Sequence, residues 1–322
     1  MTNIRFGVHL PNSGGAAVYP DSLVEYGIIR EIAREAEKLG FHSIWANEHV
    51  THPTEQTSIE TKFFEPLTLL GSLVSETTRI TLGTAIVILP FRDPFILAKE
   101  ASTLSAISGN RFVLGVGPGR FEKEYSAQSK NWAERNRILE EQLRLIRELL
   151  SGKPVEFSGK YYSSKNFSIR PIPDKLPIVL GGSGDLAIKR AARLCDGIMP
   201  GHTSVEQAKE METKLDQELV KTGFLEKEFT FYNEIILSID SDHNKAKSKF
   251  LENSYVRKIP YATDLALKAL IGTPKEIREK IQQYGGAGVE EFVLIFADES
   301  KAEFVRSMDL FSSKVMNELS YE

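Results

Sequence analysis

The sequence predicts an α/β protein in which eight strand–helix units close into a (β/α)8 TIM barrel. Three observations support this fold class. Short apolar segments alternate with longer segments of helical periodicity, the 322-residue chain contains eight such units, and parallel strands joined by helices require right-handed crossovers. The alternative is an open doubly wound sheet, which about six units would suit better.

The expected strands are short and rich in Val, Ile, Leu and Phe, as in a parallel sheet that is buried on both faces. They cover residues 4–9, 43–46, 80–86, 112–116, 178–180, 197–199, 229–239 and 291–296.

The expected helices have apolar residues at helical spacing and recognisable ends. Gly40 follows the first helix as a C-cap, and Pro94 opens the third. The helical period is clearest in the fourth helix, where Ile138, Leu143 and Ile146 recur on one face. The expected helices cover residues 24–39, 66–76, 94–107, 134–150, 185–194, 204–222 and 301–319.

Three stretches lengthen the barrel units beyond their minimum. Residues 11–23 extend the loop after strand one, and residues 152–176, after strand four, form an irregular excursion with room for a small hairpin. Residues 241–288, after strand seven, hold two or more helices. No linker or low-complexity tract is present, so we expect a single domain over residues 1–322.

The composition of the chain limits the cellular compartment and the binding partners that we expect. The net charge of −4 and the lack of a basic run argue against nucleic acid as a partner. No apolar run approaches the ~20 residues that span a bilayer, and the N-terminus lacks a secretory pattern. The single cysteine, Cys195, cannot form an internal disulfide. We therefore expect a cytoplasmic protein that does not bind membranes and acts on a small molecule.

A glycine turn follows the fifth strand. Gly181, Gly182, Ser183 and Gly184 lie between that strand and a helix. Free backbone N–H groups at a helix N-terminus favour a phosphate, so the turn is either a phosphate site or a plain strand–helix turn.

Polar side chains follow the strands where barrel active sites form. His49 follows strand two and has the pKa range for proton transfer, although a loop histidine can also simply bond a backbone carbonyl. Its neighbour Glu48 either orients the imidazole or is a solvated charge. His9 ends strand one and could be packed, and His202 follows strand six. The pair of His49 and His52 lies in a proline-containing loop, so we expect no metal site.

The glycines at 115, 117 and 119 superficially match a dinucleotide fingerprint. That motif needs a helix directly after it, whereas residues 121–132 look polar and irregular, so we reject it. The glycines either let a flat ring approach the barrel mouth or form an ordinary loop.

Together, the motifs resemble the bacterial luciferase-like family of flavin-dependent barrels. The resemblance rests on residues 40–49, 78–84, 90–99, 114–124 and 181–197. Within the family, Glu48-His49 is most similar to the branch that uses the deazaflavin coenzyme F420, while relatives with similar barrels use FMN.

The resemblance implies roles for individual residues. His49, with Glu48, would act at the reactive face of the cofactor. Independently of the resemblance, we expect His9, Arg120 and His202, which follow strands one, four and six, to bind substrate. Arg120-Phe121 stands where many relatives carry Gly-Trp, which changes the substrate pocket. The implied cofactor-binding residues are Gly181, Gly182, Ser183 and Gly184 at the phosphate, Gly117, Pro118 and Gly119 beside the ring, and Thr84, Ala85 and Ile86 behind it, where a non-prolyl cis peptide is common in the family.

The resemblance implies an oxidoreductase that uses F420 or FMN for hydride transfer or oxygenation of a small organic substrate. One rival is a non-redox lyase or isomerase acting on a phosphorylated substrate, which would need a lysine or paired carboxylates at the strand ends; we find no such pair. Another rival is a non-catalytic flavin-binding protein.

We also expect a homodimer built partly from the helices over 66–76 and 94–107, which carry more apolar residues than one buried stripe needs.

Overall fold

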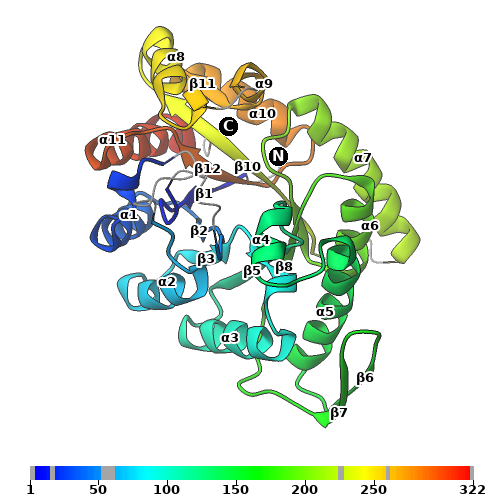
Figure 1. Cartoon of the computed structure of the whole chain (residues 1–322). Helices are drawn as coiled ribbons and strands as arrows, with labels where there is room; N and C mark the ends of the chain where they lie inside the picture. Colours follow the sequence, from blue (N-terminus) through cyan, green and yellow to red (C-terminus); the bar gives the residue numbers. More distant parts are fainter. Residues whose placement is uncertain (1–3, 15–18, 52–61, 224–227, 259–261, 320–322) are drawn as a thin grey trace.

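A closed parallel barrel forms the centre of the computed structural model, which describes residues 4–14, 19–51, 62–223, 228–258 and 262–319 (Figure 1). Neighbouring strands pair in chain order, and β9 pairs with β10 to complete the circle. The eight barrel strands are β1 (Arg5–His9), β2 (Ser43–Ala46), β3 (Thr81–Thr84), β5 (Phe112–Gly117), β8 (Ile178–Gly181), β9 (Gly197–Met199), β10 (Thr230–Ile239) and β12 (Glu291–Phe296). The predicted fold class is confirmed.

Helices surround the barrel, and those that follow its strands lie close to their predicted ranges. Asp93 caps α3 by accepting hydrogen bonds from the backbone of Phe95 and Ile96, which explains why this helix begins at its proline. The helices are α1 (Tyr26–Lys38), α2 (Pro66–Leu73), α3 (Pro94–Ile107), α4 (Glu122–Ala127), α5 (Arg135–Leu150), α6 (Asp185–Leu194), α7 (Val205–Thr222), α8 (His243–Glu252), α9 (Ala262–Lys268), α10 (Pro274–Gly285), α11 (Lys301–Phe311) and α12 (Asn317–Leu319). Short 3-10 turns cover 21–23, 74–76, 89–91, 132–134 and 256–258, and a π-helical turn covers 312–316.

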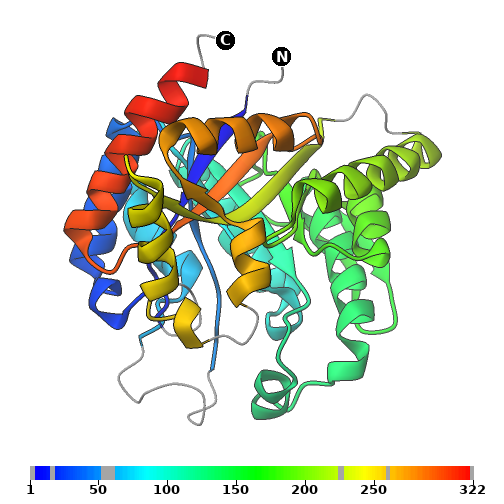
Figure 2. The same cartoon turned by 90° about the horizontal axis from the view of Figure 1, so that it is seen from above.

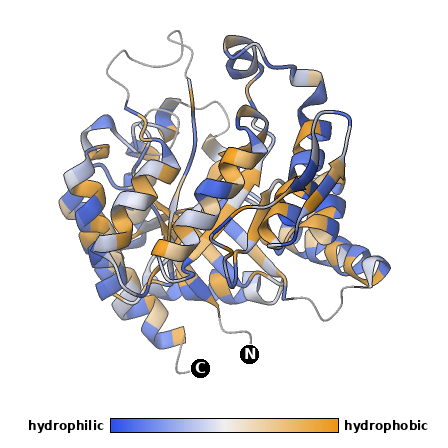
Figure 3. Cartoon of the chain, turned by 90° about the horizontal axis from the view of Figure 1, so that it is seen from below, coloured by the Kyte–Doolittle hydropathy of each residue, from blue (hydrophilic) through white to orange (hydrophobic). Residues whose placement is uncertain are grey.

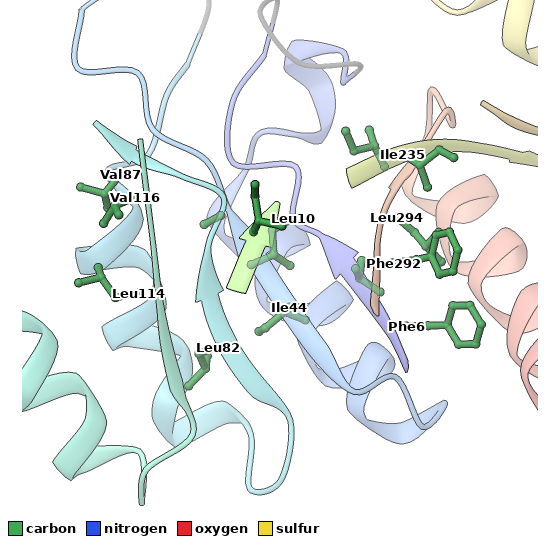
Figure 4. Close-up of a cluster of buried hydrophobic side chains, with 14 of the residues drawn as sticks. Phe6, Leu10, Ile44, Leu82, Val87, Leu114, Val116, Ile235, Phe292 and Leu294 are labelled. Carbon is green, nitrogen blue, oxygen red and sulfur yellow. The ribbon is translucent and has the colours of Figure 1, made fainter. Parts of the chain in front are cut away.

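Two layers of core follow from the alternation of side chains along each strand. One set points into the barrel, where Trp45, Val179, Tyr232 and Val293 pack together. The other set points outward and packs against the helices, as the labelled side chains in Figure 4 illustrate. Figure 2 shows α1 and α11 side by side along one flank of the strands, and Figure 3 shows hydrophobic residues concentrated in the strands, with mixed hydropathy along the outer helices.

The strand predicted over 80–86 is shorter than expected. β3 ends at Thr84, Ala85 and Ile86 leave the ladder, and the short β4 (Val87–Ile88) then pairs with β5. The carbonyl oxygen of Thr84 lies where a Cβ at Gly115 would be, only 1.8 Å from it. Glycine at position 115 is therefore required by the close approach of β3, which sequence spacing does not reveal.

The insertions contain the hairpin and the helices that were predicted, and one further strand. The excursion after α5 holds the antiparallel hairpin of β6 (Val155–Ser158) and β7 (Ser163–Phe167). The segment after β10 contains the unpredicted β11 (Leu270–Gly272), which pairs with the outer end of the ten-residue β10.

The prediction that residues 121–132 are irregular is wrong in part, because α4 begins at Glu122. Glu124 and Tyr125 are buried, and the Tyr125 hydroxyl donates to the carbonyl of Pro118. Tertiary contacts thus hold a helix that local periodicity did not indicate.

The extra apolar residues of the second helix were expected to form part of a dimer surface, but they pack inside this chain. This argument for a dimer surface is therefore wrong for α2. Its leucines Leu67, Leu69, Leu70 and Leu73 are all buried. On α3, Ile96 and Ile107 remain 59% and 58% exposed. A search of the described helices found none with the length and apolar character to cross a membrane.

Candidate active site

A cavity of about 390 Å³ opens at the carboxyl ends of the barrel strands. The loops after β2, β5 and β9 contribute to its wall, together with residues from β1, β10 and β12. This is the end at which barrel enzymes place their chemistry. The cavity brings together all of the predicted site residues except Thr84, Ser183 and Gly184.

His49 is held at the cavity wall by a carboxylate from another loop. Its Nδ1 lies 3.3 Å from Oε1 of Glu124 on α4, and the rings of Phe63 and Phe121 flank the imidazole at 5.9 and 5.8 Å. Glu124 is 1% exposed and His49 12%. A carboxylate acceptor at Nδ1 assigns the N–H to that atom, so the basic nitrogen of the neutral ring is Nε2.

Glu48 has a different role from either alternative considered for it. It is buried rather than solvated, and its carboxylate accepts from the Arg92 guanidinium and, at 2.6 Å, from the backbone N–H of Ile88. Burial raises the pKa of the Glu48 carboxyl, and the charge of Arg92 opposes that shift. Glu48 therefore fixes β4 to the loop after β2, and the orientation of His49 comes from Glu124 instead.

An apolar wall lies between these polar groups and the glycine turn. The Ala85–Ile86 peptide bond is cis, as the resemblance implies. A Cβ at Gly117 would lie 2.6 Å from the Ile86 side chain, and one at Gly181 would lie 3.1 Å from it. These two glycines thus make room for Ile86, which lines the cavity together with Ala85, Pro118 and Gly119. Thr84 lies behind this wall, where its hydroxyl donates to the carbonyl of Gly115.

The glycine turn runs from the cavity to the surface. Gly181 and Gly182 line the cavity, whereas Ser183 and Gly184 are exposed just before α6. The N–H of Gly182 donates to the carbonyl of Met199, and its φ is +142°. Within the described ranges, the N–H groups of Ser183 and Gly184 have no acceptor. The N–H groups of Ser183 and Gly184 are therefore the ones in this turn that an anion can bind.

Asp185 does not leave an uncompensated charge at this helix terminus. Its side chain is 69% exposed and accepts a hydrogen bond of 2.8 Å from Lys214. This hydrogen bond lowers the pKa of Asp185.

A second polar group lies on the wall formed by β1, β9 and β10. His9 is 1% exposed, and its Nε2 lies 3.7 Å from Oε1 of Glu234. Burial lowers the pKa values of His9 and His202 to about 4, so both rings are neutral at pH 7. Burial also raises the pKa of Glu234 to about 7, against the opposing charge of Arg120.

Sequence reasoning assigned no role to two of the three glutamates that line this cavity. Glu124 was part of the family motif, but no role was assigned to it. Glu234 lies in the middle of β10, so the search of strand ends passed over it, and only Asp240 was noted there. The alternation of inward positions could have found Glu234, because Tyr232, two residues earlier, points into the barrel.

No group of three or more His, Cys, Asp or Glu side chains in the described part of the chain has the arrangement of a metal site. His52, which forms with His49 the only pair considered as metal ligands in the sequence, lies outside the described residues.

Comparison with known proteins identifies the family. The family model for luciferase-like monooxygenases matches residues 4–268. An F420-dependent glucose-6-phosphate dehydrogenase of Amycolatopsis mediterranei is 31% identical over 247 residues, covering 73% of this chain and 69% of that protein. A protein of the same name from Intrasporangium calvum is 27% identical over 326 residues, covering 92% and 94%.

Solved structures agree on the fold. An F420-dependent secondary alcohol dehydrogenase in complex with an F420–acetone adduct matches with a TM-score of 0.81 at 20% identity, covering 97% of this chain and 98% of that one. The oxygenating constituent of 3,6-diketocamphane monooxygenase of Pseudomonas putida, in complex with FMN, matches with a TM-score of 0.78 at 17% identity, covering 98% of each chain.

The fold is a TIM barrel with its cavity at the carboxyl ends of the strands, and the relatives that the chain matches show it to be an oxidoreductase. This chain belongs to the luciferase-like monooxygenase family, as its sequence motifs implied.

Proposed function

We propose that this protein is an F420-dependent dehydrogenase that oxidises a hydroxyl-bearing carbon of a small molecule. The observation that carries the proposal is His49, held by Glu124 through Nδ1 at the wall of the cavity. The similarity to proteins named F420-dependent glucose-6-phosphate dehydrogenase favours F420 over FMN.

The residues present fit such a cofactor. The cavity has an apolar wall at Ala85 and Ile86, suited to a flat ring. Its volume lies in the range typical of small-molecule sites. At one end, the turn offers the N–H groups of Ser183 and Gly184 to a phosphate, next to the positive end of α6.

When bound, the deazaflavin supplies a two-electron hydride acceptor. Oxidation of one carbinol group would break its C–H and O–H bonds and form a C=O bond: the hydrogen on carbon would leave as hydride to the bound cofactor, and Nε2 of His49 would take the hydroxyl proton. Glu124 orients the imidazole and stabilises the imidazolium that results.

Absorbance spectroscopy of the protein titrated with F420 and with FMN tests the choice of cofactor. Turnover is then tested with 2-propanol and glucose 6-phosphate, following the loss of the visible absorbance of oxidised F420. Tight binding of F420 with reduction by either alcohol supports the proposal. Binding of FMN alone, with oxygen consumption by the reduced complex, would instead indicate a monooxygenase.

A further inference from the structure

Glu234 presents a carboxyl group to the cavity with no hydrogen-bond partner in the described part of the chain. Oε1 of Glu234 lies 3.7 Å from Nε2 of His9, which is too long for a direct hydrogen bond. Oε2 lies beside Gly201, where a Cβ would be 3.4 Å from it. The Glu234 side chain is 22% exposed.

Such a carboxyl group is costly unless a ligand satisfies it. An ionised carboxylate can accept about four hydrogen bonds, and burying one without partners is strongly unfavourable. The other two glutamates that line the cavity are committed, Glu48 to Arg92 and Glu124 to His49.

Groups from three other segments line the cavity near Glu234. His9 comes from β1, while Arg120 and His202 come from the loops after β5 and β9. Both histidines are neutral at pH 7, because burial lowers their pKa values to about 4. The guanidinium of Arg120 lies over the ring of Phe121 at 4.8 Å and has no ion-pair partner among the described residues. The wall therefore offers several hydrogen-bonding groups in one place.

We propose that Glu234 is a substrate-binding residue that hydrogen-bonds a hydroxyl group other than the one oxidised at His49. The substrate class is accordingly a diol or polyol rather than a simple alcohol. This inference rests on the proposed dehydrogenase function. Either protonation state of Glu234 serves, because a carboxylic acid donates to a hydroxyl oxygen and a carboxylate accepts from a hydroxyl proton.

The test compares substrates that differ by one hydroxyl group, 1,2-propanediol against 2-propanol and 1,3-butanediol against 2-butanol. We expect wild-type enzyme with F420 to show a kcat/KM at least about tenfold higher for the better diol than for its matched alcohol. Glu234→Met, which removes the hydrogen bonds but keeps a chain of similar length, should reduce that ratio by about 10- to 100-fold, mainly through KM. Glu234→Gln, which can still hydrogen-bond, should retain most of the ratio.

Glu279→Met is the matched control, because Glu279 lies on α10 with its side chain 58% exposed. It should keep the wild-type ratio. Saturation-transfer NMR with 1,2-propanediol and with 2-propanol supplies a readout without turnover. Wild-type protein should bind 1,2-propanediol more tightly than it binds 2-propanol, and Glu234→Met should abolish the difference.

The outcomes separate this inference from the proposed function. The role of Glu234 is refuted, and the dehydrogenase function stands, in either of two cases. In the first, wild-type enzyme oxidises each simple alcohol with the same kcat/KM as its matched diol; in the second, Glu234→Met keeps the diol preference. If none of the four alcohols is oxidised, the proposed function fails for this class of substrate. The NMR comparison then decides the role of Glu234 alone, and equal binding of both probes by wild-type protein refutes it.

Discussion

Gly182→Val should weaken cofactor binding at least tenfold, which corresponds to about 1.4 kcal/mol. The φ of Gly182 is +142°, a region that residues with a side chain rarely adopt, and a Cβ there would lie 3.0 Å from the Cβ of Ala187 on α6. A residue forced into such a conformation costs about 1–3 kcal/mol. The turn can relieve that strain only by moving the N–H groups that we assign to the phosphate.

The matched pair Gly182→Ala and Gly184→Ala isolates this effect. Gly184 has φ −80°, and a Cβ there would meet no atom within 4 Å, so its substitution should change affinity less than about threefold. The dissociation constant is measured by fluorescence titration with F420 and with FMN, and thermal unfolding establishes that each variant is folded. Wild-type affinity in folded Gly182→Val, or equal losses in the two alanine variants, would refute the phosphate assignment.

Four further predictions concern other parts of the molecule. His49→Ala should lower kcat by roughly 10² and leave cofactor affinity nearly unchanged; weaker cofactor binding with a normal chemical step would instead make His49 a positioning residue. Arg92→Met should destabilise the fold by about 3–5 kcal/mol, because it leaves Glu48 buried without its partner, and the double substitution with Glu48→Met should recover much of that loss in thermal melts. Burial raises the pKa of Glu234 to about 7, so between about pH 4.5 and 7 the folded state holds a proton that the unfolded state has lost. The free energy of unfolding of the wild type, relative to Glu234→Gln, should therefore fall by up to about 3 kcal/mol as the pH rises over that range. A difference in unfolding free energy that does not change with pH in denaturant titrations would contradict this. Light scattering should give twice the chain mass of 36.1 kDa for a dimer that uses α3, and a mass near 36.1 kDa would count against it.

The sequence by itself determined the order and most of the bounds of the barrel elements. β2, α3, α6, β9 and β12 begin and end at the predicted residues. Their signals are local: apolar runs, helical periodicity, and a proline at the first turn of α3 lie within each element. The family motifs, read together, also indicated the class of enzyme, because several short matches in the correct order are far more specific than any one of them.

Only the tertiary structure decided which polar groups act together. Glu48 is adjacent to His49 in the chain but pairs with Arg92, while Glu124, 75 residues from His49, contacts Nδ1 of its ring. Glu234 enters the cavity from the middle of a strand. Burial and long-range contacts set the partners and protonation of such groups, and neither is encoded in the spacing of residues along the chain.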